Sequence, residues 1–162
     1  VNPMARVPAL VDGDFVLWES NAICQYLCDL QGDTSLFPRN PRIRADICRW
    51  LFWQGTDWSP ATAPMAYENF VKKVFFQAEP DLARIAAAEK AFHVVAGILD
   101  KHLEGRRFLV NDQFTLADIA IASLMTFAGP GKYPMEPYAN LRRYNAELDE
   151  VPAWKNTAPK PG

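Results

Sequence analysis

Two neighbouring residues near the start of the chain have the types and spacing to bind a zwitterion. Glu19 and Ser20 directly precede a stretch whose apolar residues recur every three or four positions, which predicts a helix that begins here. A helix N-terminus presents free amide N–H groups and a partial positive charge, which together favour a carboxylate. The carboxylate of Glu19 beside it suits an ammonium group. The pair therefore fits the two charged groups of an amino-acid moiety.

Pro8 adds a second feature to the same region. It lies in a short apolar run, residues 7–11, whose composition is typical of a strand. Proline has no N–H to donate, so it implies an edge position or an interruption that leaves neighbouring backbone groups free. A cis Val7–Pro8 bond would create such an interruption. The same residues also suit an ordinary capped hairpin and helix without a ligand.

The elements that position these residues follow from the local pattern. Residues 7–11 and 15–18 are short apolar runs joined by Asp12-Gly13, which predicts a β-hairpin. Ser20 is expected to be the N-cap of the following helix, with its hydroxyl accepting a hydrogen bond from a first-turn amide. A hairpin with one helix is marginal alone, so we expect this unit to belong to a larger fold.

The opening segment resembles a known family. The residues that carry the resemblance are Asn2-Pro3, Val7-Pro8-Ala9-Leu10, Asp12-Gly13 and Glu19-Ser20-Asn21-Ala22-Ile23, which are similar to the back half of the thioredoxin-like domain of glutathione transferases. The resemblance implies a glutathione-binding set of Val7, Pro8, Glu19 and Ser20. In that set the Val7–Pro8 bond is cis, the Val7 backbone pairs with the cysteinyl part of glutathione, and Glu19 and Ser20 hold its γ-glutamyl end.

The resemblance also implies what lies outside this set. The front βαβ unit of the domain, which carries the sulfur-activating residue, is expected upstream of Val1, so no catalytic residue is assigned within the sequence. Glutathione is expected as a substrate, and no metal is expected. The fold class is therefore predicted as α+β: a partial thioredoxin-like ββα unit over residues 1–37, then an all-α helical bundle over residues 38–162 that is similar to the transferase C-terminal domain.

Aromatic residues mark the first part of the helical region. A helix is predicted over residues 41–56, with apolar side chains on two faces, and a separate helix is predicted to begin near residue 59. The resemblance implies that the first of these helices borders a subunit interface of a homodimer and the cleft for an apolar co-substrate. The candidates for that pocket or interface are Trp53, Trp58, Tyr67 and Asp57. Asp57 could also reach a ligand bound to a partner subunit.

A capping box is predicted further along the chain. Thr115 is the expected N-cap and Asp118 stands at the third helical position, with Asp in place of the usual Glu or Gln. Phe114 and Ile119 occupy the two positions of a hydrophobic staple. We interpret Asp118 as a structural residue that starts a buried central helix.

Composition narrows the class of protein. The formal net charge is −2 with no long run of one sign, so neither nucleic acid nor an anionic membrane is an expected partner. No apolar stretch approaches the length of a membrane span, and a cytoplasmic location is expected. The three cysteines, Cys24, Cys28 and Cys48, form no C-x-x-C pair, which favours a structural role for them.

The resemblance implies a detoxifying glutathione S-transferase, which conjugates the glutathione thiolate to a small hydrophobic electrophile. Two alternatives remain open. The same fold serves as a non-catalytic interaction module, and it also serves glutathione-dependent disulfide reductases or peroxidases. The second alternative needs a reactive cysteine in the segment expected upstream of Val1.

Overall fold

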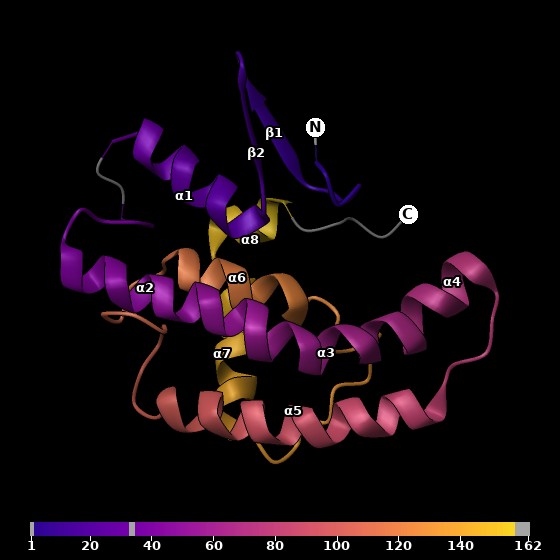
Figure 1. Cartoon of the computed structure of the whole chain (residues 1–162). Coiled ribbons are helices and arrows are strands. Elements are labelled where there is room, and N and C mark those ends of the chain that lie inside the picture. Colours follow the sequence, from indigo (N-terminus) through magenta and orange to yellow (C-terminus); the bar gives the residue numbers. More distant parts are fainter. Residues whose placement is uncertain (1, 33–34, 158–162) are drawn as a thin grey trace.

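The hairpin expected near the start of the chain is present in the computed structural model, which describes residues 2–32 and 35–157 (Figure 1). Strand β1 (Ala9–Asp12) pairs antiparallel with β2 (Phe15–Trp18), and Asp12 stands opposite Phe15. The loop therefore has two residues. The first, Gly13, has a φ of 60°, where a glycine avoids the steric cost that a Cβ would bring. The hairpin projects away from the helices (Figure 1).

Helix α1 (Ser20–Leu30) connects the hairpin to the rest of the molecule. It buries Ile23 and Cys28. The side-chain amide of Asn21 donates to the carbonyl of Leu51 at 3.2 Å, and the carboxylate of Asp29 pairs with the guanidinium of Arg44 at 2.6 Å. These polar contacts fix α1 against the following long helix, so the position of its N-terminus is set from both sides.

The long helix that follows is continuous from residue 41 to residue 76. It consists of α2 (Pro41–Trp53), the π-helical turn η1 (Gln54–Trp58), α3 (Ser59–Ala66), a second π-helical turn η2 (Tyr67–Val71) and α4 (Lys72–Phe76). Asn40 caps its start, because its side-chain oxygen accepts from the amides of Arg42 and Ile43. The predicted break between residues 56 and 59 is wrong: η1 carries the chain through as helix.

The remaining helices enclose the core. Helix α5 (Leu82–His102) runs back alongside α3, and α6 (Leu116–Met125), α7 (Ala139–Asp149) and α8 (Pro152–Thr157) complete the bundle (Figure 1). The core consists of large side chains from α2 to α7, among them Ile47, Trp58, Met65, Phe92, Leu99, Ile121, Leu141 and Tyr144. No helix in the described part of the chain has the length and apolar character needed to span a bilayer.

The predicted capping box is confirmed at the start of α6. The carboxylate of Asp118 accepts from the backbone N–H of Thr115 at 2.8 Å and from that of Leu109 at 3.0 Å. The hydroxyl of Tyr144 donates to the same carboxylate at 3.0 Å. Burial raises the pKa of Asp118, and these hydrogen bonds act in the opposite direction. Asp118 is therefore a buried junction of α6, α7 and the preceding loop, as a structural role requires.

Candidate functional site

A pocket of about 430 Å³ lies between the residues that precede β1 and the start of α1. Its lining residues are Asn2, Met4, Arg6, Val7, Pro8, Trp18, Glu19 and Ser20. All four residues predicted as the glutathione-binding set are among them. The hairpin brings these residues together. Because Ala9 pairs with Trp18, the residues just before Ala9 lie close to the residues just after Trp18. We call this pocket the hairpin pocket.

One wall of the hairpin pocket is the segment before β1. The Val7–Pro8 peptide bond is cis, as expected. The side-chain amide of Asn2 donates to the carbonyl of Arg6 at 2.7 Å, and the Asn2 side-chain oxygen accepts from the amide of Met4 at 2.9 Å. These two hydrogen bonds hold the turn in shape. Val7 is 94% exposed, so its backbone is open to a ligand.

The opposite wall is the N-terminus of α1, where one prediction is wrong. The N-cap residue is Glu19 and not Ser20, which is the first residue of the helix. Glu19 has φ 75°, ψ 114°, and no side chain caps the helix. A non-glycine residue at positive φ costs about 1–3 kcal/mol and is concentrated at functional sites. The first-turn amides of α1 have no partner within the helix, so they are available to an anion.

The hairpin pocket is lined by charges of both signs. The N-terminus of α1 carries a partial positive charge, Glu19 a negative charge and Arg6 a positive charge. Within the described residues, the side chains of Arg6, Glu19 and Ser20 make no hydrogen bond or ion pair. The pocket can therefore bind a zwitterionic ligand without first breaking contacts of its own.

Sequence reasoning assigned no binding role to Arg6, Met4 or Trp18, which also line this pocket. Only their positions in the sequence could have indicated a binding role. Arg6 directly precedes Val7, and Trp18 directly precedes Glu19, so each could have been found as a chain neighbour of a predicted site residue.

A second, mainly apolar pocket of about 400 Å³ adjoins the first at Glu19. It lies between α1 and the end of α2, and its other lining residues are Asn21, Ala22, Gln25, Cys48, Leu51, Phe52, Gly55 and Thr56. The π-helical turn η1 contributes Gly55 and Thr56. Such turns are rare and occur often at functional sites. We call this pocket the interhelix pocket.

The predicted co-substrate residues line neither of these two pockets. Trp58 is fully buried in the core against Phe92, with ring centroids 5.8 Å apart, so its assignment to a pocket or interface is wrong. Trp53 is half-buried and stacks on Trp58. Tyr67 lies further along the helix beside Phe76. Helical periodicity identified an apolar face, but it does not say whether core side chains or a ligand cover that face.

Asp57, the fourth of these residues, is exposed on η1. Its carboxylate accepts from the hydroxyl of Thr56 at 2.6 Å. Neither Asp57 nor the three aromatic residues line the hairpin pocket or the interhelix pocket.

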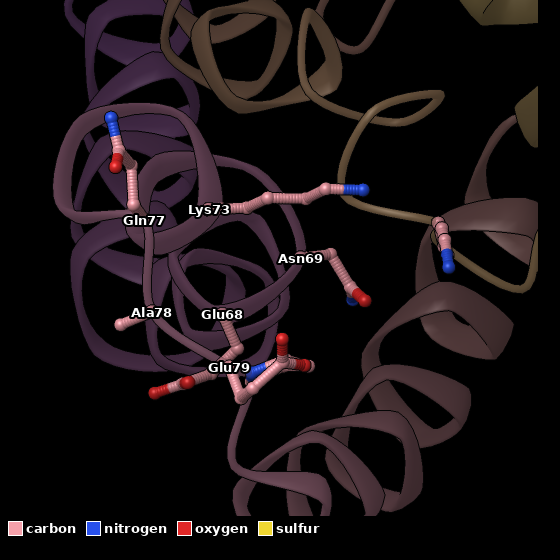
Figure 2. A pocket seen from close by; sticks show the side chains of 8 residues that line it. Glu68, Asn69, Lys73, Gln77, Ala78 and Glu79 are labelled. Atoms are coloured by element: carbon pink, nitrogen blue, oxygen red, sulfur yellow. The ribbon is translucent and has the colours of Figure 1, made fainter.

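A third pocket, of about 480 Å³, lies at the end of the long helix, where Glu68, Asn69, Lys73, Gln77 and Glu79 surround it (Figure 2). Glu68 is only 1% exposed. Its carboxylate accepts from the ammonium of Lys72 at 2.9 Å, the guanidinium of Arg84 at 3.0 Å and the amide of Asp81 at 2.9 Å. These donors lower the pKa of Glu68. The carboxylate is fully used in joining η2 to α5, which indicates a structural role.

The three cysteines are free thiols on α1 and α2. Cys28 is buried, and burial raises the pKa of Cys24, as does the neighbouring Cys28. The Cys48 thiol lies 3.7 Å from the side-chain oxygen of Gln25. Within residues 2–32 and 35–157, no group of three His, Cys, Asp or Glu side chains could hold a metal ion.

Comparison with known proteins identifies relatives of both parts of the chain. The family profile of the glutathione S-transferase N-terminal domain matches residues 1–29, and that of the glutathione S-transferase C-terminal domain matches residues 62–156. The chain is 26% identical to the probable glutathione S-transferase GSTF2 of Oryza sativa subsp. japonica, over 97% of this chain and 74% of that protein.

Solved structures agree with this match. Glutathione transferase F2 from Populus trichocarpa is 27% identical, with a TM-score of 0.84 over 95% of this chain and 74% of that chain. Ure2p5 from Phanerochaete chrysosporium was cocrystallized with 1-(S-glutathionyl)-2,4-dinitrobenzene. It is 26% identical, with a TM-score of 0.82 over 96% of this chain and 74% of that chain.

Proposed function

Because this chain belongs to the glutathione S-transferase family, we propose that its hairpin pocket binds glutathione for conjugation of the thiolate to a small hydrophobic electrophile. The observation that carries the proposal is the pocket itself, which gathers Val7, Pro8, Glu19 and Ser20 around an uncapped helix N-terminus. Solved relatives include a protein crystallized with a glutathione conjugate.

Each of the four residues has a distinct role in the proposed binding of glutathione. The α-carboxylate of the γ-glutamyl group accepts hydrogen bonds from the Ser20 hydroxyl and the free amides of α1. The ammonium of the same group pairs with the carboxylate of Glu19. The exposed backbone of Val7, beside the cis bond to Pro8, pairs with the cysteinyl backbone. These residues bind and orient glutathione, and we assign none of them to activation of the sulfur.

The reaction follows ordinary thiol chemistry. The thiol loses its proton to water to give the thiolate, which is the nucleophile. Its sulfur attacks an electrophilic carbon, a C–S bond forms, and the leaving group departs with the electron pair of the broken bond. Holding the tripeptide at both its γ-glutamyl and cysteinyl parts lowers the entropic cost of reaching that geometry.

We further propose that residues 1–37 form the glutathione-binding unit and residues 38–162 the helical domain, and that the protein is a homodimer with a subunit contact on residues 42–56. Phe52 supports the dimer, because it is a large aromatic side chain on α2 that is 75% exposed.

Calorimetric titration with glutathione tests the proposal. We expect saturable binding of one molecule per chain, weakened in Ser20→Ala. Ser123→Ala is the matched control, because Ser123 lies on α6 and its hydroxyl donates to the carbonyl of Ala120. Absence of binding at millimolar glutathione would contradict the proposal.

A second measurement separates the alternatives. Chlorodinitrobenzene is the electrophile whose reaction with glutathione gives the conjugate found in the Phanerochaete protein. Glutathione-dependent loss of chloride from it supports conjugation. When the assay is made on a protein that includes the segment expected upstream of Val1, binding without turnover would favour the interaction module, and reduction of a glutathione mixed disulfide would favour the reductase.

A further inference from the structure

The third pocket, at the end of the long helix, lies apart from the proposed glutathione site (Figure 2). We call it the helix-end pocket. Its volume of about 480 Å³ lies within the range of ligand pockets, about 300–1,000 Å³. Its walls come from η2, α4, the connection to α5 and the loop after α6. None of its lining residues belongs to the hairpin pocket, the interhelix pocket or the proposed subunit contact on residues 42–56.

One wall of the helix-end pocket is fixed by a contact between η2 and the loop after α6. The side-chain amide of Asn69 donates to the carbonyl of Gly131 at 3.0 Å. Gly131 is packed so closely that an added Cβ would lie 2.6 Å from the carbonyl oxygen of Phe127. Lys132 directly follows this anchored glycine, so the same contact sets its position at the pocket. Figure 2 shows the side chains of Asn69 and Lys73 extending from the helix in the same direction.

The free charges of the helix-end pocket favour a dianion. The Glu68 carboxylate is paired with Lys72 and Arg84, so it is not available to a ligand. Within the described residues, the ammonium groups of Lys73 and Lys132 make no hydrogen bond or ion pair. Two free ammonium groups at one pocket match a phosphate monoester, which carries close to two negative charges above about pH 7.

The other lining groups indicate what the phosphate is attached to. Ala78 and Pro80 are the only apolar residues of the lining, so the pocket offers little surface to a hydrocarbon or an aromatic ring. The side chains of Gln77 and Glu79 have no hydrogen bond or ion pair in the part of the chain that the structure describes. A carboxylate accepts hydrogen bonds from hydroxyl groups and repels a second anion. The ligand is therefore expected to carry hydroxyl groups away from its phosphate.

Two lining residues of this pocket have an unfavourable backbone conformation. Gln77 has a φ of 50° and Lys132 a φ of 57°, in the left-handed region that favours glycine and asparagine. Residues held in this region are concentrated at functional sites. Their presence on two walls of one pocket agrees with a binding role.

We propose that the helix-end pocket binds a small sugar phosphate, with its phosphate between the ammonium groups of Lys73 and Lys132 and its hydroxyl groups on Gln77 and Glu79. The proposal does not depend on glutathione binding or on conjugation. The bound ligand would join α4 to the loop after α6, and because it binds only the folded chain it should raise the melting temperature.

The experiment is calorimetric titration with glucose 6-phosphate, with glucose and inorganic phosphate as the two separate parts of this probe. We expect glucose 6-phosphate to bind at least about tenfold more tightly than either part. Lys73→Gln and Lys132→Asn should each weaken it at least about tenfold. Asparagine is chosen at residue 132 because it tolerates a positive φ. Lys90→Gln, at an exposed site on α5, is the matched control and should leave the affinity unchanged.

Glu79→Ala tests the part of the site that would hold the hydroxyl groups. This variant should weaken glucose 6-phosphate, because the sugar loses an acceptor, but it should not weaken inorganic phosphate. Equal weakening of both probes would contradict the assignment of Glu79.

Three further outcomes would overturn the proposal. Equal affinity for glucose 6-phosphate and inorganic phosphate would reduce the pocket to an unspecific anion contact. An equal loss in Lys73→Gln and Lys90→Gln would show that net charge, and not the pocket, attracts the ligand. No binding at millimolar glucose 6-phosphate, with an unchanged melting temperature, would remove the site. Glutathione titration of Lys73→Gln keeps the two proposals apart, since this variant should bind glutathione as wild type does.

Discussion

The hairpin and α1 differ from the long-helix bundle in where they place their apolar residues. Residues 2–32 bury only Ile23 and Cys28 as hydrophobic side chains, and the strands leave Val11, Phe15, Val16 and Trp18 exposed. The bundle buries nearly all of the core. Conversely, the strained residue Glu19 and the uncapped helix start lie in the first region. The residues that we propose for glutathione binding and most of the buried core therefore belong to separate parts of this chain.

The largest expected effect is on the bundle. Asp118→Ala leaves the amides of Leu109 and Thr115 and the hydroxyl of Tyr144 without their acceptor. Each buried unpaired group costs about 1–3 kcal/mol, so the loss should be about 3 kcal/mol or more. The melting temperature should then fall by about 6–12 °C.

Thermal unfolding measures this loss, and Asp149→Ala, at an exposed site on α7, is the control. Glutathione affinity measured well below the transition should be unchanged. If Asp118→Ala had a normal melting temperature but bound glutathione more weakly, stability and ligand binding would not belong to separate regions.

The second prediction concerns ligand affinity, with little expected change in stability. Ser20→Ala should weaken glutathione binding by roughly 1–3 kcal/mol, because the ligand carboxylate loses a hydrogen-bond donor. The Ser20 hydroxyl makes no capping bond in the fold, so the free energy of unfolding should change by less than about 0.5 kcal/mol. Calorimetry and thermal unfolding on the same preparation check both numbers, and an unchanged affinity would reject the assignment of Ser20.

The third prediction concerns pH and the buried Glu68. Hydrogen bonds from the Asp81 amide and Lys72 lower its pKa below the ordinary 4.5. A carboxyl whose pKa is lowered by folding stabilises the fold above its unfolded pKa, and this contribution is lost as pH falls through the folded pKa.

Glu68→Gln should therefore lower the melting temperature at pH 7, and the difference from wild type should shrink as the pH falls below about 4. Melting curves across this range test the prediction. A difference that grows on acidification would contradict it.

The smallest expected effect is on assembly. Phe52→Ser should shift the proposed dimer toward monomer on dilution, because it removes an exposed aromatic side chain from the proposed contact. Phe75→Ser, on α4, is the matched control with similar exposure. Sedimentation velocity measures both, and a concentration-independent monomer in wild type would reject the dimer.

The sequence predicted features that short segments determine. The hairpin follows from apolar runs around Asp12-Gly13, and the capping box from Thr115 and Asp118, since each depends on a few adjacent residues. The N-cap of α1 was misplaced because Glu19 adopts a positive φ, which side-chain propensity disfavours.

Features set by tertiary packing were beyond local reasoning. The long helix continues through η1 because Trp58 is buried against Phe92, a contact between residues far apart in the sequence. The interhelix pocket likewise depends on how α1 meets α2, through the contact of Asn21 with Leu51. No spacing within one segment predicts either result.

We propose that glutathione binds to the hairpin pocket and does not perturb the core of the bundle. The most direct measurement is a glutathione titration followed by the amide signals of isotope-labelled protein in nuclear magnetic resonance. We predict saturable shifts at Val7, Glu19 and Ser20, with the signals of α5 and α7 unmoved. Shifts confined to the helical domain, or no shifts at millimolar glutathione, would rule out glutathione binding in the hairpin pocket.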